Sequence, residues 1–151
     1  MLKNSKKYVN KIDSTKIYDV VIKSPITFAE NISLSTKNKI YLKREDLQPT
    51  HSFKIRGAYN KIKTLVSKQS VKHVVTASAG NHAQGVAYSA RTLKIKATIF
   101  MPRTTPTIKI DEVKKMKSKV MLVGDNFDEA LDAALKFCEK NKFCLLYTSD
   151  A

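Results

Sequence analysis

The 151-residue chain contains little cysteine and no tryptophan, and it lacks long apolar runs. No stretch approaches the roughly 18 apolar residues of a membrane span, and the lysine-rich start lacks the apolar run of a signal peptide. Cys138 and Cys144 are six positions apart and fall on different helical faces, so we expect two reduced thiols, one packed in the core. Together with the scattered His51, His73 and His82 they give no zinc spacing. The sequence predicts a cytoplasmic protein without a metal site.

Acidic residues are also scarce, with 13 Asp and Glu against 28 Lys and Arg and a formal net charge of +15. Such an excess can attract a polyanion such as nucleic acid. Only four of the 28 cations are arginines, and the lysines are spread along the chain without an Arg-rich or aromatic-interleaved run. We interpret the excess as solvated lysine-rich surface, and a basic nucleic-acid-binding module stays as the alternative.

From about residue 40 onward, strand-like apolar runs alternate with apolar positions at helical spacing. We expect strands at 40–44, 73–77, 97–101 and 120–123. The first forty residues are polar and irregular, with one or two short helices at most. This alternation predicts an α/β fold with an open, mostly parallel sheet flanked by helices, whose ligand sites lie beyond the carboxyl ends of the strands.

Two helix starts carry capping signals. Asn126 with Glu129 three residues later forms a capping-box pattern, and Phe127 begins the apolar face of the helix that follows. Thr105 followed by Pro106 predicts an N-cap with proline at the first helical position.

Lys54 lies where a loop meets a predicted helix. Phe53 and Ile55 flank it, and Gly57 permits close backbone approach. A lysine that such neighbours partly desolvate can act as a nucleophile and form an imine with an aldehyde cofactor. From the residues alone, a solvated surface lysine is the competing interpretation.

A loop of small residues follows the expected strand at 73–77. Ser78, Ala79 and Gly80 leave their N–H groups unobstructed, and a helix starting near Asn81 adds its positive end, so a carboxylate would be favoured there. A plain strand-to-helix turn is the alternative. The spacing of Gly80 and Gly85 does not match a dinucleotide fingerprint, and no GxxxxGK[ST] loop occurs.

These two segments resemble a known family. Residues 43–59 read KREDLQPTHSFKIRGAY and residues 76–87 read TASAGNHAQGVA. They are similar to the lysine segment and the asparagine loop of the biosynthetic threonine dehydratases (threonine ammonia-lyases), which are pyridoxal 5′-phosphate enzymes of the tryptophan-synthase-β-like fold type II. The match continues through Met101-Pro102, Ile108-Lys109 and residues 124–130, and covers roughly residues 8 to 144.

The resemblance implies a role for each matching residue. Lys54 would hold pyridoxal 5′-phosphate as a Schiff base and then remove the α-proton of the substrate. Phe53 would pack beside the pyridine ring, and Asn81 would hydrogen-bond the ring oxygen. The substrate carboxylate would be gripped by Ser78, Gly80, Asn81 and His82.

The same resemblance implies the reaction. L-threonine would be converted by β-elimination to 2-oxobutanoate and ammonia, the first step of isoleucine biosynthesis, in a cytoplasmic homotetramer. Ala79 stands where related serine racemases carry a serine acid/base, which favours elimination over racemisation. A broader serine/threonine dehydratase stays open as the alternative, because no side chain in the sequence can be assigned to recognise the methyl group of threonine.

The chain also departs from the family's pattern. The family's glycine-rich phosphate loop lies further downstream, and none of the four glycines here is adjacent to another. The resemblance implies that residues 1–69 open the large cofactor domain and that residues 70–151 form the small α/β domain. We therefore expect an N-terminal fragment that is inactive alone, and we expect the last few residues, within 145–151, not to be native.

Overall fold

A parallel sheet is the centre of the computed structural model, which describes residues 2–147. Within that range four strands form this sheet in the order β5-β4-β3-β6. Their bounds are His73–Ala77 (β3), Lys96–Met101 (β4), Lys119–Leu122 (β5) and Cys144–Leu145 (β6). All three pairings are parallel. The predicted α/β fold with an open parallel sheet is confirmed.

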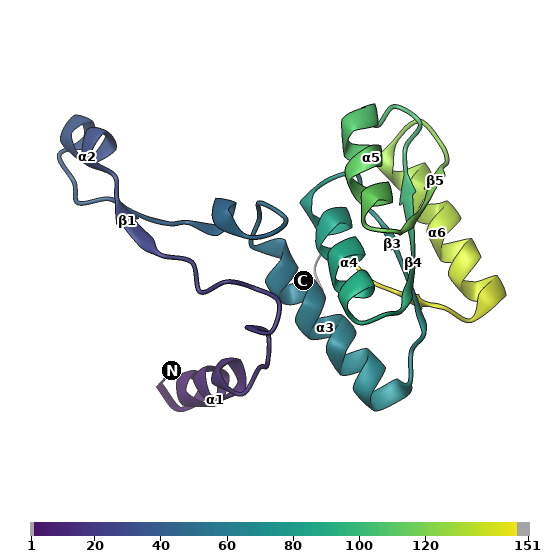
Figure 1. Cartoon of the computed structure of the whole chain (residues 1–151), viewed down its shortest axis with the longest axis horizontal. Helices are drawn as coiled ribbons and strands as arrows, with labels where there is room; N and C mark the ends of the chain where they lie inside the picture. The colour runs from purple at the N-terminus through teal and green to yellow at the C-terminus, as the bar shows by residue number, and fades with distance from the viewer. Residues whose placement is uncertain (1, 148–151) are drawn as a thin grey trace.

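Helices cover both faces of this sheet (Figure 1). They are α3 (Lys54–Gln69), α4 (Asn81–Thr92), α5 (Thr107–Lys115) and α6 (Phe127–Asn141). Val74 packs with apolar residues of α3 and α4, whereas its neighbour Val75 packs with α6. Since successive strand residues face opposite sides, α3 and α4 lie on one face and α6 on the other. Ile99 and Ile110 place α5 beside α4.

The segment before α3 forms an arm that extends away from the sheet (Figure 1). It consists of α1 (Leu2–Asp13), β1 (Ile26–Phe28), α2 (Glu30–Thr36), β2 (Tyr41–Lys43) and the 3₁₀ turn η1 (Glu45–Leu47). The strand expected at 40–44 exists as β2, but it pairs antiparallel with β1 and lies outside the parallel sheet.

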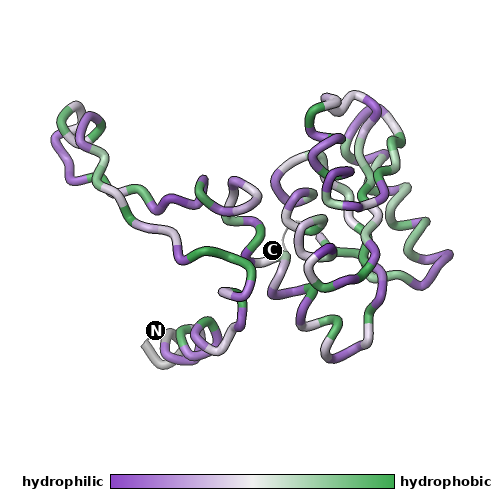
Figure 2. Tube along the Cα trace, viewed as in Figure 1, coloured by the Kyte–Doolittle hydropathy of each residue, from purple (hydrophilic) through white to green (hydrophobic). Residues whose placement is uncertain are grey.

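Several apolar residues of this arm are exposed. Figure 2 shows hydrophobic stretches, in green, along the part of the chain that extends away from the sheet. Ile26 is 66% exposed and Phe28 is 52% exposed, although the Phe28 ring lies 5.3 Å from that of Tyr41. Strand β1 was not predicted, because three residues are too few to show the pattern of a strand.

The two predicted caps have different outcomes. Asn126 Oδ1 accepts the Glu129 N–H at 3.0 Å, so the predicted N-cap is confirmed. The return bond differs from a capping box, because Glu129 Oε2 accepts the N–H of Asp125, one residue before the cap, at 2.8 Å. The Thr105 cap is wrong: α5 begins at Thr107 with Pro106 as its N-cap, because Pro106 has an extended ψ of 137°. 

Two further expectations concern single side chains. Phe127 is 49% exposed, so it does not join Ala130 and Ala134 in the core as its place on the apolar face of α6 predicted. Cys138 is buried, Cys144 is half-buried, and no disulfide joins them, as predicted. No helix in residues 2–147 is both long enough and apolar enough to cross a membrane.

The end of the described chain is part of the sheet. Leu146 is 2% exposed. Its N–H donates to the Val75 carbonyl at 2.8 Å, and its own carbonyl accepts the Thr76 hydroxyl at 2.8 Å. These bonds extend β6 along β3 and complete the core beneath α3.

Candidate functional site

Lys54 is the first residue of α3 and is half-buried. Its backbone N–H donates to the Ser52 hydroxyl at 3.2 Å. Its amine lies 5.6 Å from the centre of the Phe53 ring, which is itself 57% exposed. The predicted nucleophile therefore stands at a helix start with one face of an accessible aromatic ring beside it.

The small-residue loop lies at the carboxyl end of β3, where the sequence predicts a ligand site. The Ser78 N–H continues the sheet by donating to the Phe100 carbonyl at 3.0 Å, and the Gly80 N–H donates to the Ser78 hydroxyl at 3.3 Å. A β-carbon built on Gly80 meets nothing within 4 Å, so open space lies in front of the loop. Asn81 then begins α4 on the exposed side, and His82 is buried.

Gly85 joins these two parts of the site. A β-carbon on Gly85 would lie 3.3 Å from the carbonyl carbon and oxygen of Lys54 and 3.3 Å from the N of Ile55. Helix α4 thus touches the backbone at the start of α3. Asn81 lies four residues before Gly85, which is about one helical turn, or about 5.4 Å, closer to the start of α4. The structure therefore brings the lysine segment and the asparagine loop together at one edge of the sheet.

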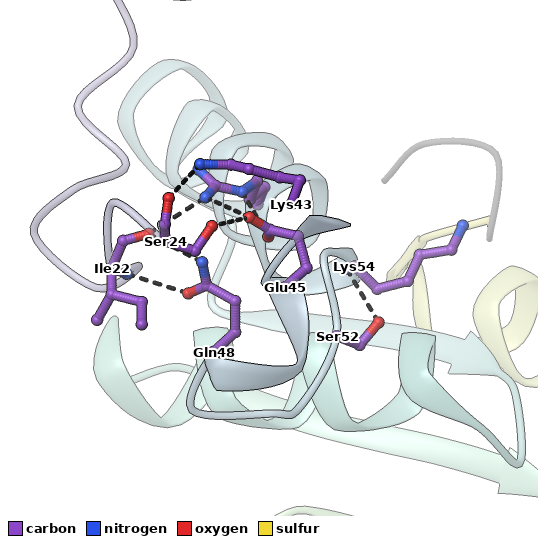
Figure 3. Close-up of polar contacts among 8 residues, drawn as sticks. Ile22, Ser24, Lys43, Glu45, Gln48, Ser52 and Lys54 are labelled. Atoms are coloured by element: carbon purple, nitrogen blue, oxygen red, sulfur yellow. Dashed lines mark hydrogen bonds and ion pairs between the residues drawn. The ribbon is translucent and has the colours of Figure 1, made fainter. Parts of the chain in front are cut away.

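Glu45 forms a half-buried ion pair with Arg56, two residues after Lys54 in the sequence. Figure 3 shows Glu45 and its polar contacts together with Lys54. Arg56 Nε donates to Glu45 Oε2 at 2.8 Å, and one terminal nitrogen of Arg56 donates to Glu45 Oε1 at 2.8 Å. The Ser24 hydroxyl donates to the same Glu45 oxygen at 2.5 Å. The hydrogen bonds from Arg56 have the largest effect on Glu45, and together with the bond from Ser24 they lower its pKa to about 2. The same contact with Glu45 raises the pKa of Arg56.

The same network ties the N-terminal segment to this corner. Gln48 is 1% exposed and bonds both backbone groups of Ile22: Oε1 accepts the N–H at 3.0 Å, and Nε2 donates to the carbonyl at 2.8 Å. Lys43 Nζ donates to the Ser24 carbonyl. Sequence analysis missed this network, because its partners in residues 22–24 are mostly backbone atoms, which leave no pattern in the sequence.

A groove of about 610 Å³ runs along the outer side of α3, next to the turn that follows α1. Five lysines line it: Lys11, Lys16, Lys61, Lys63 and Lys68. Lys63 Nζ is bonded to Asp19 Oδ2 at 2.7 Å and to the Lys16 carbonyl at 2.9 Å. None of the predicted site residues lines this groove.

The residues at the sheet edge fit the reactive end of an aldehyde cofactor with an amino-acid substrate. A half-buried amine, an exposed ring, an open small-residue loop and a helix N-terminus meet there. A phosphate cradle is not among them. Gly124 has a φ of +70°, but the space beside it is filled by Glu129, whose β-carbon would lie 2.3 Å from an added β-carbon. That turn caps a helix and leaves no room for an anion.

Comparisons with known proteins agree with this geometry. Residues 17–150 match the family model described as pyridoxal-phosphate dependent enzyme. A threonine dehydratase of Nicotiana attenuata is 50% identical over 132 residues, which are 87% of this chain and 22% of that protein. The biosynthetic L-threonine dehydratase of Pasteurella multocida is 45% identical over 139 residues, 92% of this chain and 27% of that protein. The chain thus spans about a quarter of the length of these relatives.

Solved structures give the same result. The processed form of threonine deaminase isoform 2 from Solanum lycopersicum superposes with a TM-score of 0.89 at 43% identity, over 98% of this chain and 41% of that one. Maize serine racemase gives a TM-score of 0.82 at 30% identity, over 91% and 41% of the two chains. With residues 17–150 matched by the family model, this chain belongs to the family of pyridoxal-phosphate dependent enzymes.

Proposed function

We propose that this chain carries the lysine and carboxylate-binding segments of a threonine dehydratase, which converts L-threonine to 2-oxobutanoate and ammonia. The contact of Gly85 with the Lys54 backbone carries the proposal, because it joins an amine to an anion-binding loop at one edge of the sheet. The names of relatives at 45% and 50% identity support the choice of substrate.

Lys54 is proposed to hold pyridoxal phosphate covalently through Nζ and, once released by the incoming amino acid, to take the proton from its α-carbon. When bound, the cofactor supplies the electron sink for that proton loss. Phe53 offers an accessible ring face beside the amine. Asn81, at the exposed start of α4, would hydrogen-bond the ring oxygen of the cofactor. 

The loop before α4 is proposed to bind the substrate carboxylate. The N-terminal end of α4 carries partial positive charge, and backbone N–H groups there lack helical partners of their own. Open space at Gly80 leaves room for the carboxylate. The group would be held by Ser78, Gly80, Asn81 and His82. Binding here would place the α-carbon of the substrate beside Lys54.

We further propose a role in the first step of isoleucine biosynthesis, in the cytoplasm, as a homotetramer. Relatives from both bacteria and plants carry the word biosynthetic in their names, and the plant ones among them are chloroplastic. Residues 1–69 are proposed to belong to a large cofactor domain and residues 70–151 to a small one. The boundary falls between α3 and β3.

The test is an assay of the longest product of this gene with L-threonine and with L-serine, in the presence of pyridoxal phosphate. We expect 2-oxobutanoate and ammonia from threonine, and less pyruvate from serine. Lys54→Ala should lower turnover by about 10²–10⁴-fold, since it removes the proton acceptor. Lys136→Ala, on the exposed side of α6, is the matched control. Equal rates with serine would favour the broader dehydratase, and activity that survives Lys54→Ala would contradict the proposal.

A further inference from the structure

Arg56 controls how the first turn of α3 is oriented. It lies two residues after Lys54, and its N–H donates to the Phe53 carbonyl at 3.0 Å. Residues two apart on a helix point to nearly opposite sides. Figure 3 shows the Lys54 side chain extending away from Glu45, the residue whose carboxylate binds Arg56. A fixed Arg56 side chain therefore fixes the rotation of the turn, and with it the direction of Lys54.

The first turn of α3 has little local support of its own. Phe53 is the N-cap, and within the described residues its side chain makes no capping hydrogen bond. The turn also carries no acidic residue to complement the helix dipole. Helix ends without caps fray unless other contacts hold them. Apart from the Lys54 N–H, which donates to the Ser52 hydroxyl at 3.2 Å, this turn therefore depends on tertiary contacts to keep Lys54 in place.

Those contacts come from two sides. On one side Gly85 of α4 lies against the Lys54 backbone. On the other side the Glu45 carboxylate accepts two hydrogen bonds from Arg56, and the Ile22 carbonyl accepts a further Arg56 N–H at 3.2 Å. The pair is shielded, with side-chain exposures of 23% for Arg56 and 17% for Glu45. The neighbouring pair of Arg44 and Asp46 is open, at 36% and 56%.

We propose that Glu45 is a positioning residue for Lys54: by holding Arg56 it sets the first turn of α3, so that the Lys54 amine faces the loop before α4. This inference rests on the proposed role of Lys54 as the lysine that bonds the cofactor. Glu45 acts through Arg56 and touches neither cofactor nor substrate.

The test compares Glu45→Gln with Asp46→Asn. Both variants remove one negative charge from η1 and both leave an arginine without its carboxylate, but only Glu45 contacts α3. Each variant is made in the longest product of this gene, incubated with pyridoxal phosphate and reduced with borohydride. The modified lysines are then quantified by peptide mapping. The ratio of label on Lys54 to label on the exposed Lys136 is the readout. A urea unfolding midpoint is measured in parallel.

In the unaltered protein we expect label on Lys54 in preference to Lys136. Glu45→Gln should lower that ratio about tenfold under conditions where the protein is fully folded, since small misplacement of a reacting group is costly. Asp46→Asn should leave it unchanged. A purely structural role of Glu45 would lower the urea midpoint without changing the ratio, and that result would overturn the inference.

Two further outcomes separate the positioning role from the proposed function. Label that shows no preference for Lys54 in the unaltered protein would refute the cofactor role of Lys54, and the positioning role with it. If Glu45→Gln does not fold, Glu45→Asp replaces it, because a shorter carboxylate keeps the charge. We expect Glu45→Asp to lower the ratio of Lys54 label to Lys136 label by less than the tenfold expected for Glu45→Gln. An unchanged ratio in Glu45→Asp would overturn the inference.

Discussion

Gly85 lies directly against the backbone of Lys54. A β-carbon at position 85 would be 3.3 Å from the Lys54 carbonyl carbon and oxygen, closer than a comfortable contact with backbone atoms. The absence of a side chain on α4 therefore lets two helices meet where the reactive amine emerges.

Gly85→Ala should destabilise the fold by about 1 kcal/mol. Alanine favours a helix by about 1 kcal/mol over glycine, but overpacking against backbone costs about 1–3 kcal/mol. The start of α3 cannot retreat freely, because Glu45 holds it from the other side. Urea unfolding measures the change. Gly80→Ala is the control and should stay within about 0.5 kcal/mol, since its β-carbon meets nothing within 4 Å. A Gly85→Ala protein more stable than its parent would contradict this packing.

Glu45 should make the protein sensitive to acid. Its pKa is about 2 in the fold against 4.5 in an unstructured chain, so its contribution to stability is complete above pH 4.5 and disappears as the pH falls toward 2. Solvent still reaches the pair, so we expect about 1–2 kcal/mol. Unfolding free energies at several pH values between 6 and 2 give the slope. Glu45→Gln should flatten that slope relative to Asp46→Asn, and equal slopes would count against the ion pair.

Asn126→Ala should lower stability by about 1 kcal/mol. The change removes the Oδ1 atom that accepts the Glu129 N–H at 3.0 Å and leaves the first turn of α6 without its cap. Asn141→Ala at the other end of the same helix is a suitable comparison, because its side chain only donates to the Phe137 carbonyl. Thermal unfolding of the two variants should show the larger loss for position 126. Equal losses would mean that the cap contributes nothing of its own.

Cys138 should react slowly with iodoacetamide. It is 7% exposed, and burial raises its pKa to about 11 from an ordinary 9. Since the thiolate is the reactive form, labelling at pH 8 should be about 100-fold slower in the folded protein than in urea. Mass spectrometry of time points resolves the two cysteines. Rapid labelling of folded Cys138 would show that α6 does not pack on the sheet as described.

Much of the sheet could be predicted because its strands are buried. The segment His73–Ala77 carries Val74, Val75 and Ala77, is buried from Val74 onward, and forms β3 with the predicted bounds. Strand β6 has two residues, too few to give a pattern, and it is held mainly through Leu146. Strand β1 has three residues and exposes Ile26 and Phe28, so it is too short to show a strand pattern and has no buried apolar face.

The candidate site was predictable where it depends on side-chain type and strand ends. The sequence placed Lys54 and Asn81 at helix starts, and the structure has both there. The contact that joins them was not predictable, because Gly85 acts through the side chain that it lacks. The ion pair of Glu45 with Arg56 was not predictable either. Its geometry depends on residues 22–24, which contact η1 although Ser24 is 21 positions before Glu45 in the sequence.

The most direct test of the central claim is the visible absorption spectrum of the longest product of this gene, purified with pyridoxal phosphate, before and after Lys54→Ala. A Schiff base with a protein lysine shifts the absorption of the cofactor away from that of the free aldehyde. We predict that the shifted band is present in the parent protein, is lost in Lys54→Ala and is kept in Lys136→Ala. A shifted band that persists in Lys54→Ala would show that another lysine holds the cofactor and would contradict the account.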